Sequence, residues 1–512
     1  MRNPMDIKRV VIVGGGTAGW LAANHLGKAA LNNELLSVTL IESPDIPTIG
    51  VGEGTVPAIR QSLQSFGISE TEFIKRCDVT FKQSIKFANW LDKEVHGQHN
   101  FYHHLFDMPS SLGKELTQAW LSKKGRTYAE TISPQHAVCE AYKGPKTISD
   151  AEYKGHLGYA YHLNAAKFAK LLGENAQERF NVQHISANVQ EVILGEDGEI
   201  KSLVTDSVGT LDFDFYIDCS GFASLLIDKA LKVPFVDKAE QLFVDKAITV
   251  QVPTDPASAI PPFTIATAHQ AGWIWDIALS NRRGVGFVYS SKYMDDETAV
   301  CKLDHYLGGK LSEHSYRTIP MKVGYRERFW EKNCVALGLA QGFLEPLEAT
   351  SILLTDFSAG FLANRFPTSA AQLDGMRQQF NQVMGYAWER VVDFIKLHYC
   401  LSDRIDSQFW IDNGDPGTMS DELSKRLSLW SSFIPNREDF FSKFEVFDLE
   451  NYLYVLYGMN LPTQVALSRA SDESNARMHS DKIARIADQL VNELPNHREL
   501  LEKINRYGLQ EV

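Results

Sequence analysis

Two charged residues far apart in the chain, Lys82 and Glu348, have the side-chain types that could move protons together. Lys82 lies in TFKQSIKFANW (80–90), and Glu348 lies in GFLEPLEATS (342–351). A buried lysine has a lowered pKa and can act as an acid or an amine near neutral pH, while a neighbouring glutamate can give or take the proton. Each residue also has a plainer interpretation. Lys82 alone is typical of a solvated surface charge, and Glu348 of an acid stabilised by a helix dipole.

The loop around Glu348 also has the pattern of an anion site. Residues 334–363 predict a buried strand, a glycine-containing turn, a loop with two glutamates and then a helix. Pro346 fixes the backbone in the middle of that loop. Thr350 and Ser351 stand about where the helix begins, so their N–H groups could face an anion.

The N-terminal region has a nucleotide-binding pattern. A buried strand at 8–13 precedes a helix, and a second strand ends at Glu42. Between strand and helix, Gly14, Gly16 and Gly19 have the spacing G-x-G-x-x-G. The first glycine makes the tight turn, the second lets a pyrophosphate approach the backbone, and the third lets helix and strand pack closely. Because Glu42 stands where a carboxylate would bind a ribose, we expect a dinucleotide site, with both FAD and NAD possible.

Other segments have more than one interpretation. The Gly/Pro-rich loop at 47–57 precedes a helix that starts near Val56, and it could lie against a planar ring or form a long turn. Histidines and aromatic residues gather within 95–150; a substrate wall or ordinary packing is favoured over a metal site, because a third ligand is lacking. Trp273 and Trp275 share one face of a strand and are typical of a core.

The rest of the pattern indicates an α/β chain with two sheets. A helix and two strands within 164–194, and a strand ending at Gly221, continue the nucleotide-binding part. Residues 240–330 have long β-type runs with glycine breaks, which predict a separate antiparallel sheet. After residue 365 the pattern is mostly helical, and 481–494 predicts an amphipathic packing helix.

Composition and charge limit the class of protein. At 512 residues the chain exceeds what one hydrophobic core usually serves, so we expect two or three subdomains. The net charge of −13 argues against binding to nucleic acid or anionic membranes. The 6 cysteines form no CxxC pair, and no apolar run reaches the ~18 residues of a membrane span. Without a signal-peptide pattern either, we expect a cytoplasmic protein.

Motifs along the whole chain resemble those of the flavin-dependent halogenases of the tryptophan-halogenase type. They are GGGTAG (14–19), IGVGEGT (49–55), FKQSIKFANW (81–90), DCSGF (218–222), GWIWDI (272–277) and FLEPLEATS (343–351). The motif W-x-W-x-I-P separates these enzymes from flavin hydroxylases, and here Ala278 replaces its proline. The resemblance implies a flavin-monooxygenase-like, Rossmann-type FAD-binding domain, an antiparallel substrate sheet and a C-terminal helical region.

The resemblance also implies a division of the chain. A discontinuous FAD-binding domain would comprise 1–95, 155–230 and 330–370, and a substrate-binding region would comprise 96–154, 231–329 and 371–512. The residues expected to bind FAD are Gly14, Gly16, Thr17, Ala18, Gly19, Glu42, Gly50, Val51, Val189 and Leu339.

In such enzymes FADH2, O2 and a halide form hypohalous acid at the flavin, and the oxidant passes through a tunnel to a lysine, which matches Lys82. Glu348 matches the catalytic glutamate, which would polarise the oxidant or take the proton from the halogenated ring. The halide would lie by Thr350 and Ser351. Tryptophan halogenases have glycine in place of Ser351 and serine in place of Ala349, so we expect bromide to be favoured over chloride.

The substrate end departs from the family pattern. Tryptophan halogenases hold the amino acid with a glutamate, whose position falls near Ser442, and with a tyrosine pair that 433–444 lacks. The stacking tryptophan falls at Phe447. We therefore expect indole, or an indole-bearing compound other than free tryptophan. Further expected substrate contacts are His103 or His104, Leu105 or Phe106, Glu345 and Pro346.

The chain has one dinucleotide pattern and no nicotinamide unit, so we expect a separate reductase to supply FADH2, and the family suggests a homodimer. Two alternatives remain: a single-component-like aromatic flavin hydroxylase, and a non-catalytic FAD-binding protein. Lys82 with Glu348 argues against the hydroxylase, which needs no such pair. Ala278 and Ala349 mildly favour loss of catalysis, while the intact Lys82 and Glu348 oppose it.

Overall fold

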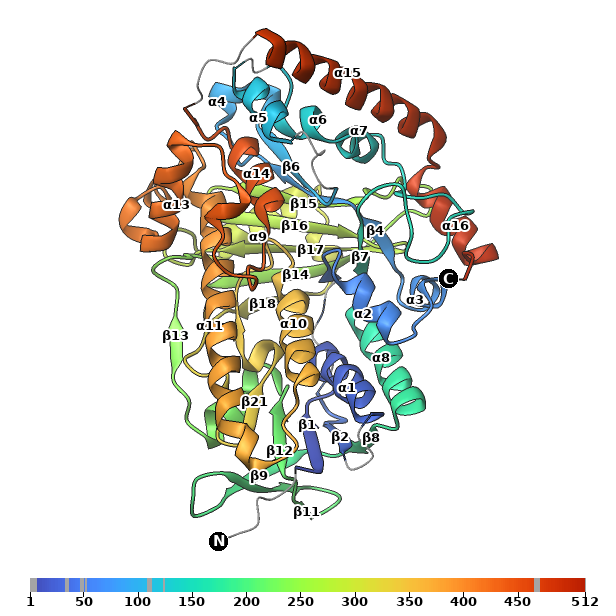
Figure 1. The fold of residues 1–512 in the computed structure, drawn as a ribbon, viewed down its shortest axis with the longest axis vertical. Helices are drawn as coiled ribbons and strands as arrows, with labels where there is room; N and C mark the ends of the chain where they lie inside the picture. The colour runs from blue at the N-terminus through green and yellow to red at the C-terminus, as the bar shows by residue number, and fades with distance from the viewer. Residues whose placement is uncertain are drawn as a thin grey trace.

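The computed structural model describes residues 7–32, 36–46, 50, 53–107, 113–122, 125–464 and 470–511. Two sheets follow one another along the long axis of the molecule, and helix α11 (Ala370–Cys400) runs beside both (Figure 1). The N-terminal strands and α1 lie at one end, and the helices α5, α6, α7 and α15 lie at the other. The long helix therefore links the nucleotide-binding end to the rest of the molecule.

A six-stranded sheet forms the nucleotide-binding end, in the order β20–β21–β12–β1–β2–β8. Its central strand β1 pairs in parallel with β2 and β12. Helix α1 (Thr17–Ala30) connects β1 to β2 and packs against α8 (Ala165–Phe180) and α10 (Thr350–Asn364). The predicted strand–helix–strand unit is therefore confirmed. The strands are β1 (Arg9–Val13), β2 (Ser37–Glu42), β8 (Gln183–Ser186), β12 (Phe215–Asp218), β20 (Trp330–Glu331) and β21 (Cys334–Ala336).

A seven-stranded sheet, in the order β18–β14–β17–β16–β15–β5–β6, forms the middle of the molecule. All its pairs are antiparallel except β15 with β5. The predicted antiparallel sheet thus also takes in β5, which precedes the expected domain boundary at residue 95. The strands are β5 (Ser84–Ala88), β6 (Phe101–Leu105), β14 (Lys246–Pro253), β15 (Phe263–His269), β16 (Gly272–Ala278), β17 (Arg282–Tyr289) and β18 (Tyr316–Pro320).

A small sheet of β3 (Glu53–Gly54), β7 (Ala160–Leu163) and β4 (Thr80–Lys82) connects these two parts. Strand β4 places Lys82 opposite Ala160 of β7. The following helix α2 (Ile59–Ser65) begins later than the expected Val56. The reason is the tight first turn, in which Ile59 N–H donates to the carbonyl of Val56, three residues back.

Helices dominate the chain after residue 365, as predicted. Within α15 (Ala470–Glu493), Ile483 is buried but Ile486 is 36% exposed, so the predicted apolar face packs only in part. The other helices are α3 (Glu70–Arg76), α4 (Lys93–His96), α5 (Gly113–Ser122), α6 (Tyr128–Ile132), α7 (Gln135–Glu140), α9 (Asp296–Tyr306), α12 (Gln408–Asn413), α13 (Asp421–Ser432), α14 (Leu449–Gly458) and α16 (His497–Tyr507). The remaining strands are β9 (Val189–Leu194), β10 (Ile200–Thr205), β11 (Thr210–Leu211), β13 (Phe235–Asp237), β19 (Gly324–Arg326) and β22 (Gly342–Phe343).

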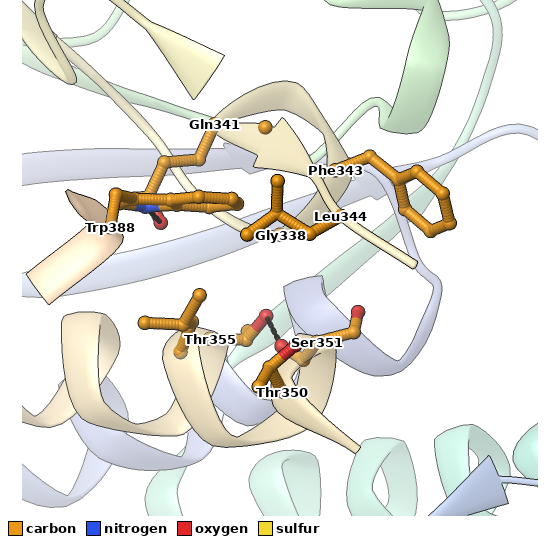
Figure 2. Close-up of a pocket in the computed structure, with 10 residues that line it drawn as sticks. Gly338, Gln341, Phe343, Leu344, Thr350, Ser351, Thr355 and Trp388 are labelled. Atoms are coloured by element: carbon orange, nitrogen blue, oxygen red, sulfur yellow. Dashed lines mark hydrogen bonds between the residues drawn. The ribbon is translucent and has the colours of Figure 1, made fainter. Parts of the chain in front are cut away.

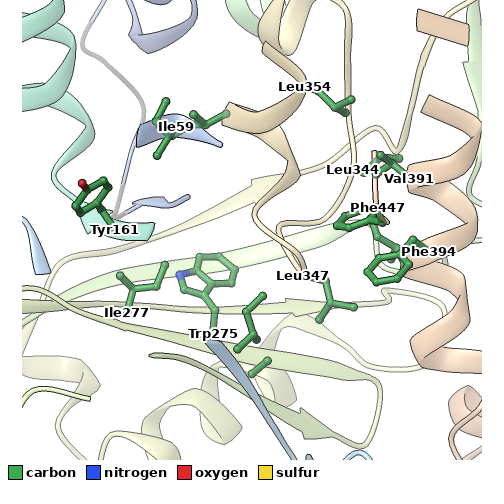
Figure 3. Close-up of a cluster of buried hydrophobic side chains, with 14 of the residues drawn as sticks. Ile59, Tyr161, Trp275, Ile277, Leu344, Leu347, Leu354, Val391, Phe394 and Phe447 are labelled. Atoms are coloured by element: carbon green, nitrogen blue, oxygen red, sulfur yellow. The ribbon is translucent and has the colours of Figure 1, made fainter. Parts of the chain in front are cut away.

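The loop before α10 is anchored by its apolar residues. Leu344 and Leu347 are buried, and Figure 3 shows them near Phe394 of α11 and Phe447, with Trp275 of β16 on the other side. Burying each leucine stabilises the fold by roughly 1.5–3 kcal/mol. Since Leu347 is fixed in this core, the neighbouring Glu348 has little freedom of position.

Candidate active site

The turn between β1 and α1 requires glycine at two of the three predicted positions. Gly14 has a φ of +116°, and a Cβ there would lie 2.2 Å from the Cys219 carbonyl oxygen. A Cβ on Gly19 would lie 1.8 Å from the Gly14 carbonyl oxygen. Gly16 differs, because a Cβ there would meet no atom within 4 Å. Gly14 and Gly19 are thus needed for packing, whereas Gly16 borders open space at the start of α1.

That open space fits the pyrophosphate of FAD. It lies at the N-terminus of α1, where Thr17 and Ala18 begin the helix and where backbone N–H groups favour an anion. Gly221, after β12, has a φ of +69°, and a Cβ there would also meet nothing within 4 Å. FAD bound at this edge of the parallel sheet would supply the redox chemistry of the site.

Two other residues expected to bind FAD, Glu42 and Leu339, lie near this turn. Glu42 packs on Gly15, whose Cβ would lie 2.1 Å from the Glu42 Cδ, and its carboxylate lies 3.1 Å from His184. Leu339 follows Gly338, which packs against Ala18.

Of the remaining positions, Val189 lies on a strand and Gly50 lies in a loop. Val189 begins β9, directly after Asn188, which accepts a hydrogen bond from Ser43, the residue that follows β2. Gly50 packs against Ala165 at the start of α8, while Val51 lies outside the described residues. FAD contacts at these positions stay predictions.

Lys82 is completely buried at the end of β4. Its Nζ donates a hydrogen bond to the Thr55 carbonyl at 3.1 Å and lies 5.1 Å from the centre of the Phe106 ring. A Cβ added to Gly54 would lie 3.3 Å from the same Nζ, so this glycine leaves the room that the ammonium occupies. Burial lowers the pKa of Lys82 to about 7, although nearby Glu348 acts in the opposite direction. The surface interpretation of this lysine is therefore wrong.

Glu348 is 1% exposed and lies between two histidines. Its carboxylate is 2.9 Å from Nδ1 of His104 on β6 and 2.8 Å from Nε2 of His398 on α11. Burial alone would raise the pKa of Glu348, but the charge and hydrogen bonds of the two histidines outweigh burial and lower it to about 2. The carboxylate thus stays ionised in the interior.

Strand β6 separates the two histidines that the sequence could not distinguish. His104 faces Glu348, whereas His103 faces the other side of the sheet, with Ser84 at 3.0 Å and Glu140 at 2.9 Å. Phe106 lies beside Lys82. The structure therefore brings His104 and Phe106 to the Lys82–Glu348 pair and leaves His103 apart from it.

Thr350 and Ser351 begin α10 on the other side of the same loop. They line a small cavity together with Gly338, Gln341 and Trp388 (Figure 2). Between this cavity and Glu348 stands Ala349, whose φ of +55° is left-handed and uncommon for a residue with a Cβ. This conformation turns the chain, so that Glu348 faces the histidines while the start of α10 lines the cavity.

Glu345 lies in the core rather than beside Lys82. It is completely buried, and its carboxylate accepts hydrogen bonds from Trp273 Nε1 and the Tyr399 hydroxyl, each at 2.6 Å. Burial raises the pKa of Glu345 to about 7 despite these two donors. The residue links the loop to β16 and α11. Pro346 accepts a hydrogen bond from the N–H of Ala349, and substrate contact by either residue stays a prediction.

The aromatic residue expected to stack on the substrate is itself packed. Phe447 is 4% exposed, and its ring lies 3.8 Å from that of Phe394, centre to centre, in a stacked arrangement. Ser442 accepts a hydrogen bond from the N–H of Phe444. Substrate binding by Phe447 stays a prediction.

Comparison with known proteins identifies the family. A sequence model of the tryptophan halogenase family matches residues 9–473. The chain belongs to that family. The tryptophan 6-halogenase SttH of Streptomyces toxytricini is 34% identical, over 97% of this chain and 98% of that protein.

Solved structures support the same assignment. A tryptophan halogenase from Shewanella frigidimarina is 36% identical, with a TM-score of 0.94 over 99% of each chain. Tar14, a tryptophan C-6 flavin-dependent halogenase (chlorinase), is 34% identical, with a TM-score of 0.90 over 97% of this chain and 99% of that one. The protein is therefore an enzyme, a flavin-dependent halogenase, and the predicted α/β fold with a Rossmann-like FAD-binding domain is confirmed.

Two residues of this halogenase's site were missed from the sequence. His398 is a single histidine within a 31-residue helix, and no spacing links it to Glu348. Asn451, whose Oδ1 lies 2.9 Å from His104 Nε2, stands in α14, and no spacing in the sequence links it to His104. Among the described residues, no group of three or more His, Cys, Asp or Glu side chains is placed to hold a metal ion. No helix in the described part of the chain is long and apolar enough to span a membrane.

Proposed function

We propose that this halogenase transfers halogen to indole, or to an indole-bearing compound other than free tryptophan, with Lys82 delivering the oxidant and bromide favoured over chloride. The observation that carries the proposal is the burial of Lys82 and Glu348 beside one wall, formed by His104 and Phe106. Buried charges are costly, and strongly perturbed pKa values are concentrated at functional sites.

FAD, held at the Gly14–Gly19 turn and bound in its reduced form, supplies with O2 the oxidising power that turns halide into hypohalous acid. Lys82 holds that oxidant by a hydrogen bond or as a haloamine. A pKa of about 7 lets Lys82 exist as both ammonium and amine near neutral pH. Glu348 polarises the oxidant or takes the proton that leaves the ring. Thr350 and Ser351 hold the halide at the start of α10.

The substrate proposal depends on groups that would bind an amino acid. The relatives named above are tryptophan halogenases, yet in this chain the position of the family's glutamate falls near Ser442, and 433–444 contains no tyrosine. Each missing charged hydrogen bond costs on the order of 1.5–3 kcal/mol of binding. An indole ring without the ammonium and carboxylate loses nothing by their absence, so such a compound should bind better than free tryptophan.

The halide proposal depends on Ala349 and Ser351. Tryptophan halogenases have serine at the first of these positions and glycine at the second, so this chain has the hydroxyl at the other position, which suits bromide, the larger and softer anion. A separate flavin reductase supplies FADH2 to the enzyme. We further infer a homodimer that works in the cytoplasm.

A product assay tests these points together. The purified protein is supplied with FAD, NADH, a flavin reductase, equal bromide and chloride, and either indole or tryptophan. Mass spectrometry should detect bromoindole as the main product. Hydroxyindole would instead support the hydroxylase, and halogenated tryptophan formed faster than haloindole would overturn the substrate proposal. No product across a broad panel of indoles and phenols would favour a FAD-binding protein without catalysis.

A further inference from the structure

The hydrogen bonds around His398 determine where its protons lie. Its Nδ1 is 2.8 Å from the Phe394 carbonyl oxygen, which can only accept, so Nδ1 carries a proton. Its Nε2 is 2.8 Å from Oε1 of Glu348. Without a second proton, that contact would set the lone pair of Nε2 against those of a carboxylate. A proton therefore also lies between His398 and Glu348.

His104 gives the same result on the other side of Glu348. The amide nitrogen of Asn451 is directed toward the Asp448 carbonyl at 3.5 Å, which turns Oδ1 of Asn451 toward Nε2 of His104 at 2.9 Å. Nε2 of His104 thus carries a proton, and its contact with Glu348 through Nδ1 needs another. The two histidines and Glu348 therefore hold four protons together. One charged histidine, one neutral histidine and a carboxylate would hold three.

The two histidines differ in their surroundings. His104 belongs to the same wall as Phe106. The His398 ring is completely buried and packs on Phe87 at 4.8 Å and Phe394 at 5.3 Å, ring centre to ring centre. Its Nε2 contacts Oε1 of Glu348, the carboxylate whose charge raises the pKa of Lys82 against the effect of burial.

We propose that His398 is a positioning residue that holds a proton, which passes through Glu348 to the oxidant and is later replaced during halogen transfer. The proposal rests on the function proposed above. When the ring carbon bonds to the halogen X of HO–X, the O–X bond breaks and its electron pair stays on oxygen. The proton at Nε2 of His398 passes to the Glu348 carboxylate and from there to that oxygen, which leaves as water. The ring C–H bond then breaks, its electrons return to the ring, and its proton goes back through Glu348 to His398.

The overall reaction is ArH + HOX → ArX + H2O, and the protein ends as it began. The titratable groups facing His398 are Glu348 from the loop before α10 and Tyr102 and His104 from β6, while Lys82 of β4 acts on it through Glu348. Phe87 of β5 and the following Trp90 present only rings. These groups set the charge around the stored proton.

The test is His398→Gln, which keeps an N–H donor for Glu348 but has no proton to release. We expect the turnover rate with indole to fall roughly 100-fold, the low end for acid–base catalysis, with KM little changed. FAD affinity and flavin oxidation should stay as in the wild type. A variant with the wild-type turnover rate would overturn the proposal.

His25→Gln is the matched control, because His25 on α1 makes the same type of contact, at 2.7 Å, with Asp356 of α10. It should keep the wild-type turnover. Neutron diffraction from wild-type crystals at pH 7 provides a measurement without any variant, and it should locate deuterium on Nδ1 of His398 and in the Nε2–Glu348 contact. The absence of deuterium between Nε2 of His398 and Glu348 would overturn the proposal. A wild-type enzyme that forms no haloindole refutes the proposed function instead, which separates the two failures.

Discussion

The two ends of this site are built by opposite means. At the end proposed to bind FAD, Gly14 and Gly19 let neighbouring backbone segments pack closely, and Gly16 borders open space at the start of α1. At the other end, Lys82 and Glu348 are ionisable groups taken out of water and held by partners from distant segments. The first arrangement depends on local backbone geometry, whereas the second depends on the whole fold. Substitutions at the two ends should therefore fail in different ways.

The largest effect should follow Lys82→Met, which removes the amine and keeps an unbranched apolar chain in its place. We expect halogenation to fall by at least about 100-fold, while oxidation of reduced flavin continues, because the glycine turn is untouched. Product formation by mass spectrometry and NADH consumption measure the two quantities separately. Retained haloindole formation would contradict the role proposed for Lys82.

Lys86→Met is the matched control for this variant. Lys86 lies four positions further along the chain, in β5, and its Nζ contacts Glu140 at 2.7 Å rather than the Glu348 group. Halogenation should stay within about twofold of the wild type, because an exposed ion pair of this kind contributes little energy. Equal losses in both variants would show that any missing lysine charge disturbs this region.

The same lysine should make stability depend on pH. Burial lowers the pKa of Lys82 from 10.5 to about 7, so between these values the unfolded chain binds a proton that the folded protein lacks. The free energy of unfolding of the wild type, relative to Lys82→Met, should therefore rise as the pH increases from about 7 toward 10.5 and stay flat below that range. Urea unfolding of both proteins across this range measures the difference, and a difference that falls with pH would contradict the burial of a lowered-pKa amine.

The sequence predicts the glycine turn and the helix start better than it predicts the partners of Glu348. The β1–α1–β2 unit and the start of α10 at Thr350 were predicted because glycine spacing, apolar runs and a helix start are local signals. The choice between His103 and His104 was not predictable, since a shift of one residue reverses the face of a strand and only pairing with β5 fixes it. His398 approaches Glu348 through the packing of α11, which leaves no pattern in the sequence.

Two alanine substitutions in the glycine turn should have different effects. Gly19→Ala places a Cβ 1.8 Å from a backbone oxygen, so the turn must shift and the free energy of unfolding should fall by about 1–3 kcal/mol. Gly16→Ala meets only open space and should leave the stability of the FAD-free protein within about 0.5 kcal/mol. Its FAD affinity should weaken by about tenfold, or 1.4 kcal/mol. Chemical unfolding and FAD titration measure these effects, and unchanged FAD affinity in Gly16→Ala would contradict a pyrophosphate at that position.

The smallest effect should come from Ala349→Gly, between the two sides of the loop. The left-handed backbone at Ala349, with φ +55° and ψ 39°, costs an alanine about 1–2 kcal/mol, and glycine adopts it freely. Glycine also loses about 0.5–1 kcal/mol more conformational entropy on folding, so the net gain in stability should be roughly 0.5–1 kcal/mol. Ala363→Gly, near the other end of α10, is the control and should destabilise by a similar amount, because its backbone is helical. Urea unfolding compares the two variants, and a loss of stability in both would show that the turn at Ala349 stores no strain.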